Sequence, residues 1–279
     1  EYSKSVIAHE AQHLIHSNYT DKGLTFNEGL SEMAIIICGY GDVGVSFSRY
    51  LSNVGDIGWE WEQSSGAHYD MGALFVLYFA EQLGDESLKV FQNINAYEFN
   101  AFQQLLDYYN TGLTTESWFS NWFIANYLND KSMNSAYGYT YTVGKAKPTA
   151  WHLSGQVESE LKLIKDHDVN YIYYSSSADS LPITFTSTGR TPIYKSIEFT
   201  NSDLIINDVI DNEEYIVYND TSTINSVVFM VANNDKYFTD DVSYQYVSTG
   251  ENTGEWTATK LLTYDDGEVD VFEYSGGSF

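Results

Sequence analysis

Two histidines and a glutamate near the start of the chain have a spacing that suits metal chemistry. His9, Glu10 and His13 form the pattern His-Glu-x-x-His within an apolar stretch of helical period. Residues four apart on a helix project from one face, so both imidazoles can reach one metal ion. Zinc suits this set because it lowers the pKa of a bound water towards about 7, and Glu10 can take the proton of that water. Taken alone, the five-residue pattern is a hypothesis.

Two acids then open the next apolar stretch, where Glu28 and Glu32 are one helical turn apart. A carboxylate in a buried helix is costly unless it is paired or bound to a metal. The alternative is an exposed first turn, where acids are favoured by the helix dipole. Following a His-Glu-x-x-His helix, Glu28 is the expected third zinc ligand. Glu32 can accept the second ring proton of a ligand histidine and fix its tautomer.

The stretches 9–13 and 27–32, which read HEAQH and NEGLSE, together resemble the motifs of the gluzincin metallopeptidases, as in thermolysin-like enzymes. The connection between the two motifs is shorter than in thermolysin, which points to a different branch of the group, and the wording of the motifs is more similar to hyicolysin-like secreted bacterial peptidases. The metzincin pattern fails after His13. The resemblance implies that His9, His13 and Glu28 are the three zinc ligands and that Glu10 is the general base. It also implies that Glu32 is an acid bonded to the first ligand histidine. We therefore expect a secreted, extracellular zinc metallopeptidase that acts on peptides or proteins, with an endopeptidase favoured over an aminopeptidase.

A third set of polar residues, His68, Tyr69 and Asp70, opens a strongly apolar helix expected from Gly66 onward. Peptide hydrolysis develops an oxyanion, which a tyrosine or histidine donor opposite the metal can stabilise. Gluzincins take this donor from a segment downstream of the third ligand, so the resemblance makes Tyr69 the first choice and His68 the second. The alternative is a helix cap with a packed tyrosine. The aromatic loop 55–65 either lines the substrate cleft or caps the core.

The elements that position these residues change in kind along the chain. Helical patterns are expected at 2–17, 26–39, 43–52, 86–95, 98–109 and 116–128, and the aromatics of the last helix are expected in the core. Short β-branched and aromatic runs follow, at 137–143, 169–174, 183–186, 196–199, 215–218, 226–231 and 242–247, with one or two more in 256–279. Such runs between turn residues indicate an antiparallel sandwich.

The expected fold class is therefore α+β, with a mainly helical zincin catalytic domain in 1–140 and an antiparallel β-sandwich in 141–279. Zinc peptidases of this kind have sheet structure upstream of the first motif helix, and this chain shows none before His9. We therefore expect residues 1–140 to be the C-terminal part of that domain. The sequence would then be a fragment, a processed form, or a part of a longer protein.

Composition limits the partners. The chain has 279 residues, of which 43% are hydrophobic, so a packed core is expected. Its formal net charge of −26 argues against nucleic acid or an anionic membrane surface as the main partner. No apolar run approaches the ~20 residues of a membrane span. The single cysteine, Cys38, excludes an internal disulfide and is expected to be a buried, inert thiol.

A different class of function remains open for the C-terminal domain. It could be the working part, as an adhesive or carbohydrate-binding module that takes surface glycans, with a structural or inactive zinc site in the first domain. Retention of Glu10 beside both histidines favours the enzyme, since a structural zinc site needs no base. Calcium is a further candidate ligand, although Asp265-Asp266-Gly267 reads first as a turn, because it lacks the full alternating pattern of a calcium loop.

Overall fold

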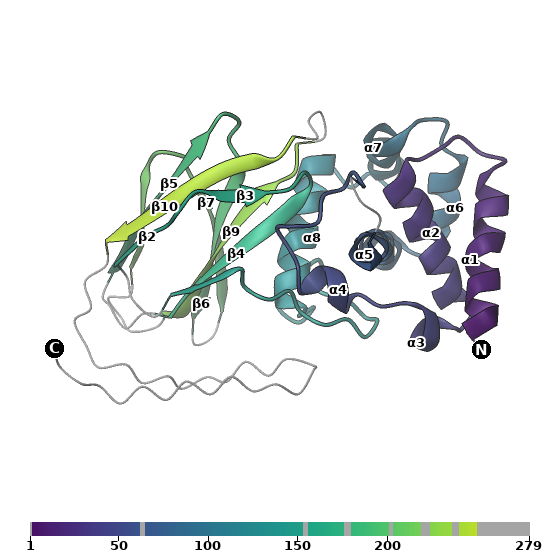
Figure 1. Ribbon diagram of the computed structural model, residues 1–279, viewed down its shortest axis with the longest axis horizontal. Coiled ribbons are helices and arrows are strands. Elements are labelled where there is room, and N and C mark those ends of the chain that lie inside the picture. The colour runs from purple at the N-terminus through teal and green to yellow at the C-terminus, as the bar shows by residue number, and fades with distance from the viewer. Residues whose placement is uncertain are drawn as a thin grey trace. The chain divides into compact units, whose positions relative to one another are not determined.

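The chain folds as an α+β protein in which the described helices precede the described strands (Figure 1). The computed structural model describes residues 2–61, 65–152, 156–175, 180–200, 203–218, 224–235 and 240–249. The expected α+β class is confirmed at this level. The strands predicted in 256–279 and the Asp265-Asp266-Gly267 turn lie outside the described residues.

The chain divides into two compact units. The first comprises Glu1–Ala146 together with two segments from later in the sequence, Lys165–Asp168 and Asn234–Asp240. The second comprises the remainder. The described helices all fall in the first unit, and the sheets are built from the second.

The helices of the first unit match the predicted ones with shifts of a few residues at their ends. The predicted helix at 43–52 is instead two short helices separated by residues 45–47, of which Val45 is extended. The helices are α1 (Tyr2–His16), α2 (Leu24–Ile37), α3 (Gly41–Gly44), α4 (Ser48–Leu51), α5 (Gly66–Leu83), α6 (Glu86–Asn93), α7 (Glu98–Tyr108) and α8 (Thr115–Leu128).

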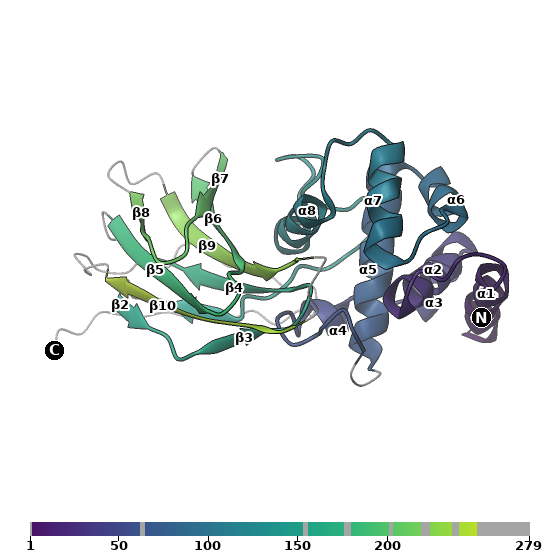
Figure 2. The ribbon, with the colours of Figure 1, turned by 90° about the horizontal axis from the view of Figure 1, so that it is seen from above.

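Helix α5 forms the centre of the first unit, with α2, α6 and α7 among its neighbours (Figure 2). Its apolar residues are buried on every side, which explains why the sequence there is hydrophobic all round. The ring of Phe75 lies 4.7 Å from that of Phe119 and 5.0 Å from that of Trp122, both on α8. The prediction that the α8 aromatics belong to the core is therefore confirmed.

The strands of the second unit form two sheets, whose pairings are mostly antiparallel. One has the order β1-β4-β9-β6-β7 and the other β2-β10-β5-β8, with β3 also paired to β10. The strands β1 and β4 pair in parallel. Their bounds are β1 (Ala150–His152), β2 (Gln156–Glu158), β3 (Lys162–Ile164), β4 (Asp168–Tyr174), β5 (Ser180–Thr188), β6 (Ile193–Thr200), β7 (Leu204–Val209), β8 (Glu214–Tyr218), β9 (Ile224–Asn233) and β10 (Val242–Thr249).

Strands of both sheets contribute to one buried hydrophobic cluster. Phe229 on β9 belongs to the first sheet and Phe185 on β5 to the second, and their ring centroids are 5.5 Å apart. Alternate residues of β10 are buried, as expected for a strand with one face on a core. Six of the predicted runs lie within β4, β5, β6, β8, β9 and β10 and are confirmed.

Two sequence-based expectations are wrong. Residues 137–143 are bends and irregular structure instead of a strand, because the amide of Tyr139 donates to Asn129 Oδ1 and the amide of Tyr141 to the Glu81 carboxylate. Cys38 is exposed instead of buried, because α2 ends at Ile37 and the cysteine caps it.

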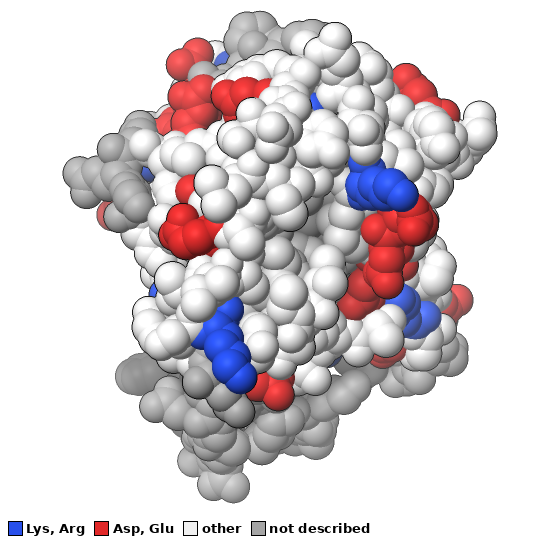
Figure 3. Space-filling model, turned by 90° about the vertical axis from the view of Figure 1, so that its right-hand side faces the viewer, with Lys and Arg blue, Asp and Glu red and all other residues white. Residues whose placement is uncertain are grey.

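Several apolar side chains of α1 are exposed, whereas those of α5 are mostly buried. Helix α1 buries Ser5, Gln12 and His16 against the unit and leaves apolar side chains in solvent. The side of the molecule on which α1 lies is largely uncharged, and several of its acidic and basic side chains lie next to one another (Figure 3). The exposed apolar side chains of α1 are Tyr2, Val6, Ile7, Leu14 and Ile15.

Candidate metal centre

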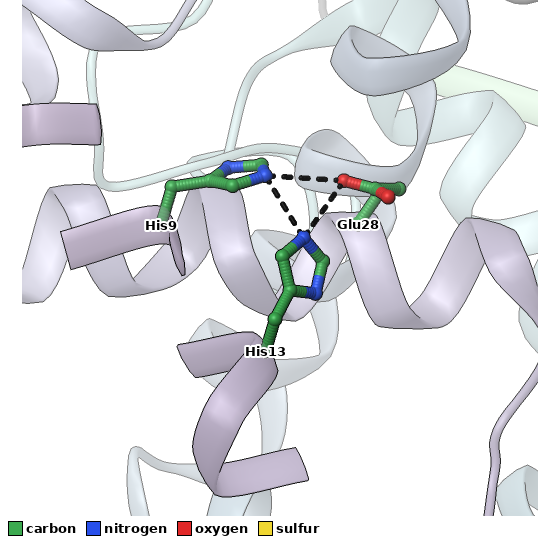
Figure 4. A group of neighbouring side chains, drawn as sticks. All are labelled: His9, His13 and Glu28. Carbon is green, nitrogen blue, oxygen red and sulfur yellow. Dashed lines mark hydrogen bonds and ion pairs between the residues drawn. The ribbon is translucent and has the colours of Figure 1, made fainter. Parts of the chain in front are cut away.

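Helices α1 and α2 bring three potential metal ligands together at one point (Figure 4). His9 and His13 project from the same face of α1, and Glu28 faces them from α2. His9 Nε2 lies 3.0 Å from His13 Nε2, while Glu28 Oε2 lies 3.2 Å from His9 Nε2 and 3.4 Å from His13 Nε2. The three residues predicted as ligands, His9, His13 and Glu28, therefore lie together in a group that could hold a metal ion.

The outer nitrogen of each histidine ring is occupied by a polar neighbour. Glu32 Oε1 lies 3.1 Å from His9 Nδ1. Asn27 Oδ1 lies 3.2 Å from His13 Nδ1, and the Ser31 hydroxyl lies 3.1 Å from the same nitrogen. A carboxylate and an amide oxygen accept hydrogen bonds, so the Nδ1 atoms carry the protons and the Nε2 lone pairs face inward.

The inward-facing atoms then fit a cation. When both rings are neutral, two imidazole lone pairs and one carboxylate oxygen converge, an arrangement that is unfavourable unless a proton or a metal ion supplies a positive charge among them. Ligands about 2.0–2.1 Å from a tetrahedral zinc ion are separated from one another by about 3.3 Å. The observed separations of 3.0, 3.2 and 3.4 Å match that figure.

Charge and exposure also fit an open metal site. The neighbouring carboxylates of Glu28 and Glu32 raise the pKa of His9 to about 9, so a metal ion would displace a proton that these carboxylates otherwise hold. The side chains of His9, Glu28 and His13 remain 14%, 13% and 25% exposed. Three protein ligands with access to solvent are typical of catalytic sites, whereas structural zinc sites usually have four.

The local packing explains how α1 and α2 hold these ligands in place. Ser31 is fully buried and donates to Gln12 Oε1 across 2.8 Å, which links the two helices beside the ligands. Sequence reasoning assigned no role to Gln12, Ser31 or Asn27. The last two lie within the Asn-Glu-Gly-Leu-Ser-Glu stretch, so polar residues one helical turn apart beside a ligand were the available signal.

Glu10, the expected base, lies next to His9 on α1 and is exposed to solvent. The preceding residue, His9, is a partly buried candidate ligand, while the side chain of Glu10 itself is open to solvent.

Tyr69 and His68, the two expected oxyanion donors, open helix α5. The Tyr69 ring centroid lies 6.3 Å from that of His9, and Trp61 packs on Tyr69 edge-to-face at 4.9 Å. His68 is buried, and its Nδ1 lies 2.9 Å from the Ser65 hydroxyl. Burial lowers the pKa of His68, which favours the neutral ring.

The aromatic loop between α4 and α5 serves two roles. Trp59 is buried and packs against Phe26 and Phe75, so it belongs to the core. Trp61 is half-buried against Tyr69 and His68, so it lies beside the candidate site. Of the two interpretations that the sequence left open, packing in the core holds for Trp59.

No family model matches this chain, and no curated protein matches its sequence. Within the part of the chain that the structure describes, no helix is both long and apolar enough to cross a bilayer.

Proposed function

We propose that the protein is a zinc-dependent peptidase, with residues 1–140 as its catalytic domain and a C-terminal β-sandwich in 141–279. The convergence of His9 Nε2, His13 Nε2 and Glu28 Oε2 beside Glu10 carries the proposal. A structural metal site would need neither an exposed carboxylate next to a ligand nor a solvent-accessible position. The resemblance of the two motifs to gluzincins supports the same function, an endopeptidase over an aminopeptidase, and action outside the cell.

The proposed chemistry is attack of water on a peptide carbonyl. Bound zinc would supply a Lewis acid that polarises the carbonyl and lowers the pKa of water. Glu10 removes the proton from the attacking water and later delivers it to the leaving amine nitrogen. Glu32 holds the proton on His9 Nδ1, which keeps His9 Nε2 available as a ligand.

Tyr69 is the better placed of the two oxyanion donors. Its ring lies near that of His9 and is only partly buried, so its hydroxyl can reach a substrate. His68 is more deeply buried and is engaged with Ser65 and Trp61. We therefore assign oxyanion stabilisation to Tyr69, with His68 as the second candidate.

The function is tested by comparing the zinc-loaded wild type with Glu10→Gln and His13→Ala on a denatured protein substrate. Glu10→Gln should bind zinc like the wild type and lose at least about 100-fold in hydrolysis, the usual contribution of a general base. His13→Ala should lose the metal. Wild-type hydrolysis by zinc-loaded Glu10→Gln would refute the mechanism, and a zinc-loaded wild type that hydrolyses nothing would refute the function.

One surface observation favours a second function for the β unit. Trp151 on β1 is 48% exposed, and its ring centroid lies 4.8 Å from that of Tyr173 on β4. An exposed indole that packs on a second aromatic ring offers a flat apolar surface, and sugar rings are a suitable ligand class for such a surface. Glycan-array binding that is lost in Trp151→Ala, with peptidase activity kept, would establish this second role; equal binding by both proteins would refute it.

A further inference from the structure

A four-residue segment from the sheet region of the chain belongs to the helical unit. Lys165–Asp168 lies between β3 and β4 in sequence, yet it is part of the first compact unit. Its His167 is fully buried, and its ring stacks on that of Phe99 with centroids 4.4 Å apart. His167 adopts a φ of +51°, in the left-handed region that few non-glycine residues occupy.

The two aspartates of this segment bind the main chain of the loop 55–60. Asp168 Oδ2 accepts hydrogen bonds from the amides of Gly55 and Ile57 at 2.7 and 2.9 Å. Asp166 Oδ2 accepts from the amide of Glu60 at 3.1 Å. Both carboxylates are buried, so these amides are the donors that make their burial tolerable.

Further bonds and a close approach complete this attachment. The main-chain oxygen of Asp166 accepts from the amide of Trp59 at 3.0 Å, and the amide of Lys165 donates to the oxygen of Gly55. A Cβ atom on Gly58 would lie 2.3 Å from Asp166 Oδ1, so only glycine lets the carboxylate come so near. A loop without regular structure is thus held along its length.

The same loop leads directly to the candidate metal centre. Trp59 O accepts from the Thr25 hydroxyl at 2.6 Å, and Trp61 Nε1 donates to the same hydroxyl oxygen at 2.9 Å. Thr25 lies on α2, one turn before Glu28. Trp61 in turn packs against Tyr69 and His68. A continuous series of contacts therefore connects Asp166 and Asp168 with Tyr69, the proposed oxyanion donor.

We propose that Asp166 and Asp168 are positioning residues for the metal centre: they fix the loop 55–61 so that Trp61 holds Tyr69 beside the metal ligands. This inference rests on the proposed peptidase function. It assigns to residues 165–168, which lie outside 1–140, a part in building the catalytic site.

Four variants of the full chain test it. Asp168→Ala removes the acceptor of two loop amides, whereas Asp168→Asn keeps an oxygen that can accept them. Gly58→Ala pushes a Cβ atom against the Asp166 carboxylate from the loop side. Glu81→Ala is the matched control, because Glu81 also accepts two loop amides, those of Thr140 and Tyr141, but lies at the opposite end of α5 from Tyr69.

Three measurements separate a local role from general destabilisation. In Asp168→Ala and Gly58→Ala, amide hydrogen exchange in 55–61 should be at least about tenfold faster while the rest of the first unit is unchanged. The kcat for peptide hydrolysis should fall about tenfold with KM within about twofold, since an oxyanion donor acts mainly in the transition state. Zinc affinity should stay within about twofold of wild type because the ligands lie on α1 and α2. Asp168→Asn should behave like the wild type.

Several results would overturn the inference. One is exchange in 55–61 that is no faster in Asp168→Ala than in Glu81→Ala, and another is an equal loss of kcat in both. A variant that exchanges faster everywhere and loses zinc would show general destabilisation instead. If the zinc-loaded wild type hydrolyses nothing, the proposed function fails, while the exchange in 55–61 still decides whether Asp168 fixes the loop.

Discussion

At the candidate metal centre, the orientation of each histidine ring depends on residues that lie outside the group of His9, His13 and Glu28. Glu32 faces His9 Nδ1, and Asn27 and Ser31 face His13 Nδ1. These contacts decide which nitrogen of each ring points inward and how basic it is. Metal affinity should therefore depend on side chains that never touch the ion.

The clearest test is Glu32→Ala, which removes the acceptor at His9 Nδ1. We expect zinc affinity to fall about 10- to 100-fold, the usual effect of losing such a partner. Glu32→Gln keeps an oxygen acceptor and should lose less, while Glu28→Ala removes a ligand and should lose most. Competition with a chromophoric chelator measures all three affinities. Wild-type affinity in Glu32→Ala would contradict the assigned role.

His16, at the end of α1, should make the metal-free protein sensitive to acid. Burial lowers the pKa of His16 below its usual value of 6.5, while the unfolded chain keeps that usual value. The unfolded state therefore binds protons more readily as the pH falls below about 6.5, and folding stability is lost there but not above pH 7.

Urea unfolding of the metal-free wild type and of His16→Leu, at pH 7.5 and pH 5, measures this effect. The fall in the midpoint between the two pH values should be smaller in the variant, since leucine has no proton to bind. A chelator in both samples keeps metal loss out of the comparison. An equal fall in both proteins would show that His16 does not carry the effect.

At the scale of elements, α2 and α5 meet at two glycines. A Cβ atom on Gly29 would lie 2.4 Å from the main-chain oxygen of Gly72, and one on Gly72 would lie 2.6 Å from that of Thr25. No side chain larger than hydrogen fits either place. The glycine in the Asn-Glu-Gly stretch is thus explained by packing next to the ligand Glu28.

Gly29→Ala should therefore force the two helices apart and move Glu28 with them. We expect a loss of about 1–3 kcal/mol in unfolding free energy, as for other overpacked cores, together with weaker zinc binding. The control is Gly39→Ala, where a Cβ atom meets nothing within 4 Å and only the positive φ is strained. That variant should lose about 1–2 kcal/mol and keep its zinc affinity. Unchanged stability in Gly29→Ala would contradict the close contact.

Local spacing predicted the grouping of His9, His13 and Glu28 because a helix fixes that spacing. His9 and His13 share a face in any helix, and the next helix needed only to pack nearby for Glu28 to join them. Features that depend on distant partners were not predictable in this way. The alternating run 137–143 has the composition of a strand, but its amides bond to Asn129 and Glu81, which no local pattern reveals. Strands β1, β2, β3 and β7 were missed. The first three are only three residues long, and half of the residues of β7 are half-buried, which weakens the alternation.

At the scale of the whole molecule, the first unit is not continuous in sequence. Residues 1–146 hold its helices, but Lys165–Asp168 and Asn234–Asp240 complete it. Asn234 donates from its side chain to Glu116 O and to the Ser120 hydroxyl on α8. Composition showed a change of character near Tyr137, but it could not show that later segments return to the helices, because a few polar residues carry no periodic signal.

A chain that ends at Ala146 should therefore fail to fold into a rigid unit. It would lack the acceptors for the amides of Gly55 and Ile57 and would uncover Phe99, against which His167 stacks. Each unsatisfied buried group costs about 1–3 kcal/mol, and domains of this size are stable by only about 5–15 kcal/mol. We expect residues 1–146 to bind the dye ANS, to lack near-ultraviolet circular dichroism and to unfold without a cooperative transition.

The full chain carrying Glu81→Ala is the matched comparison, since it loses amide acceptors but keeps both returning segments. Cooperative unfolding of 1–146 with the same midpoint as the full chain would show that the helices need neither segment.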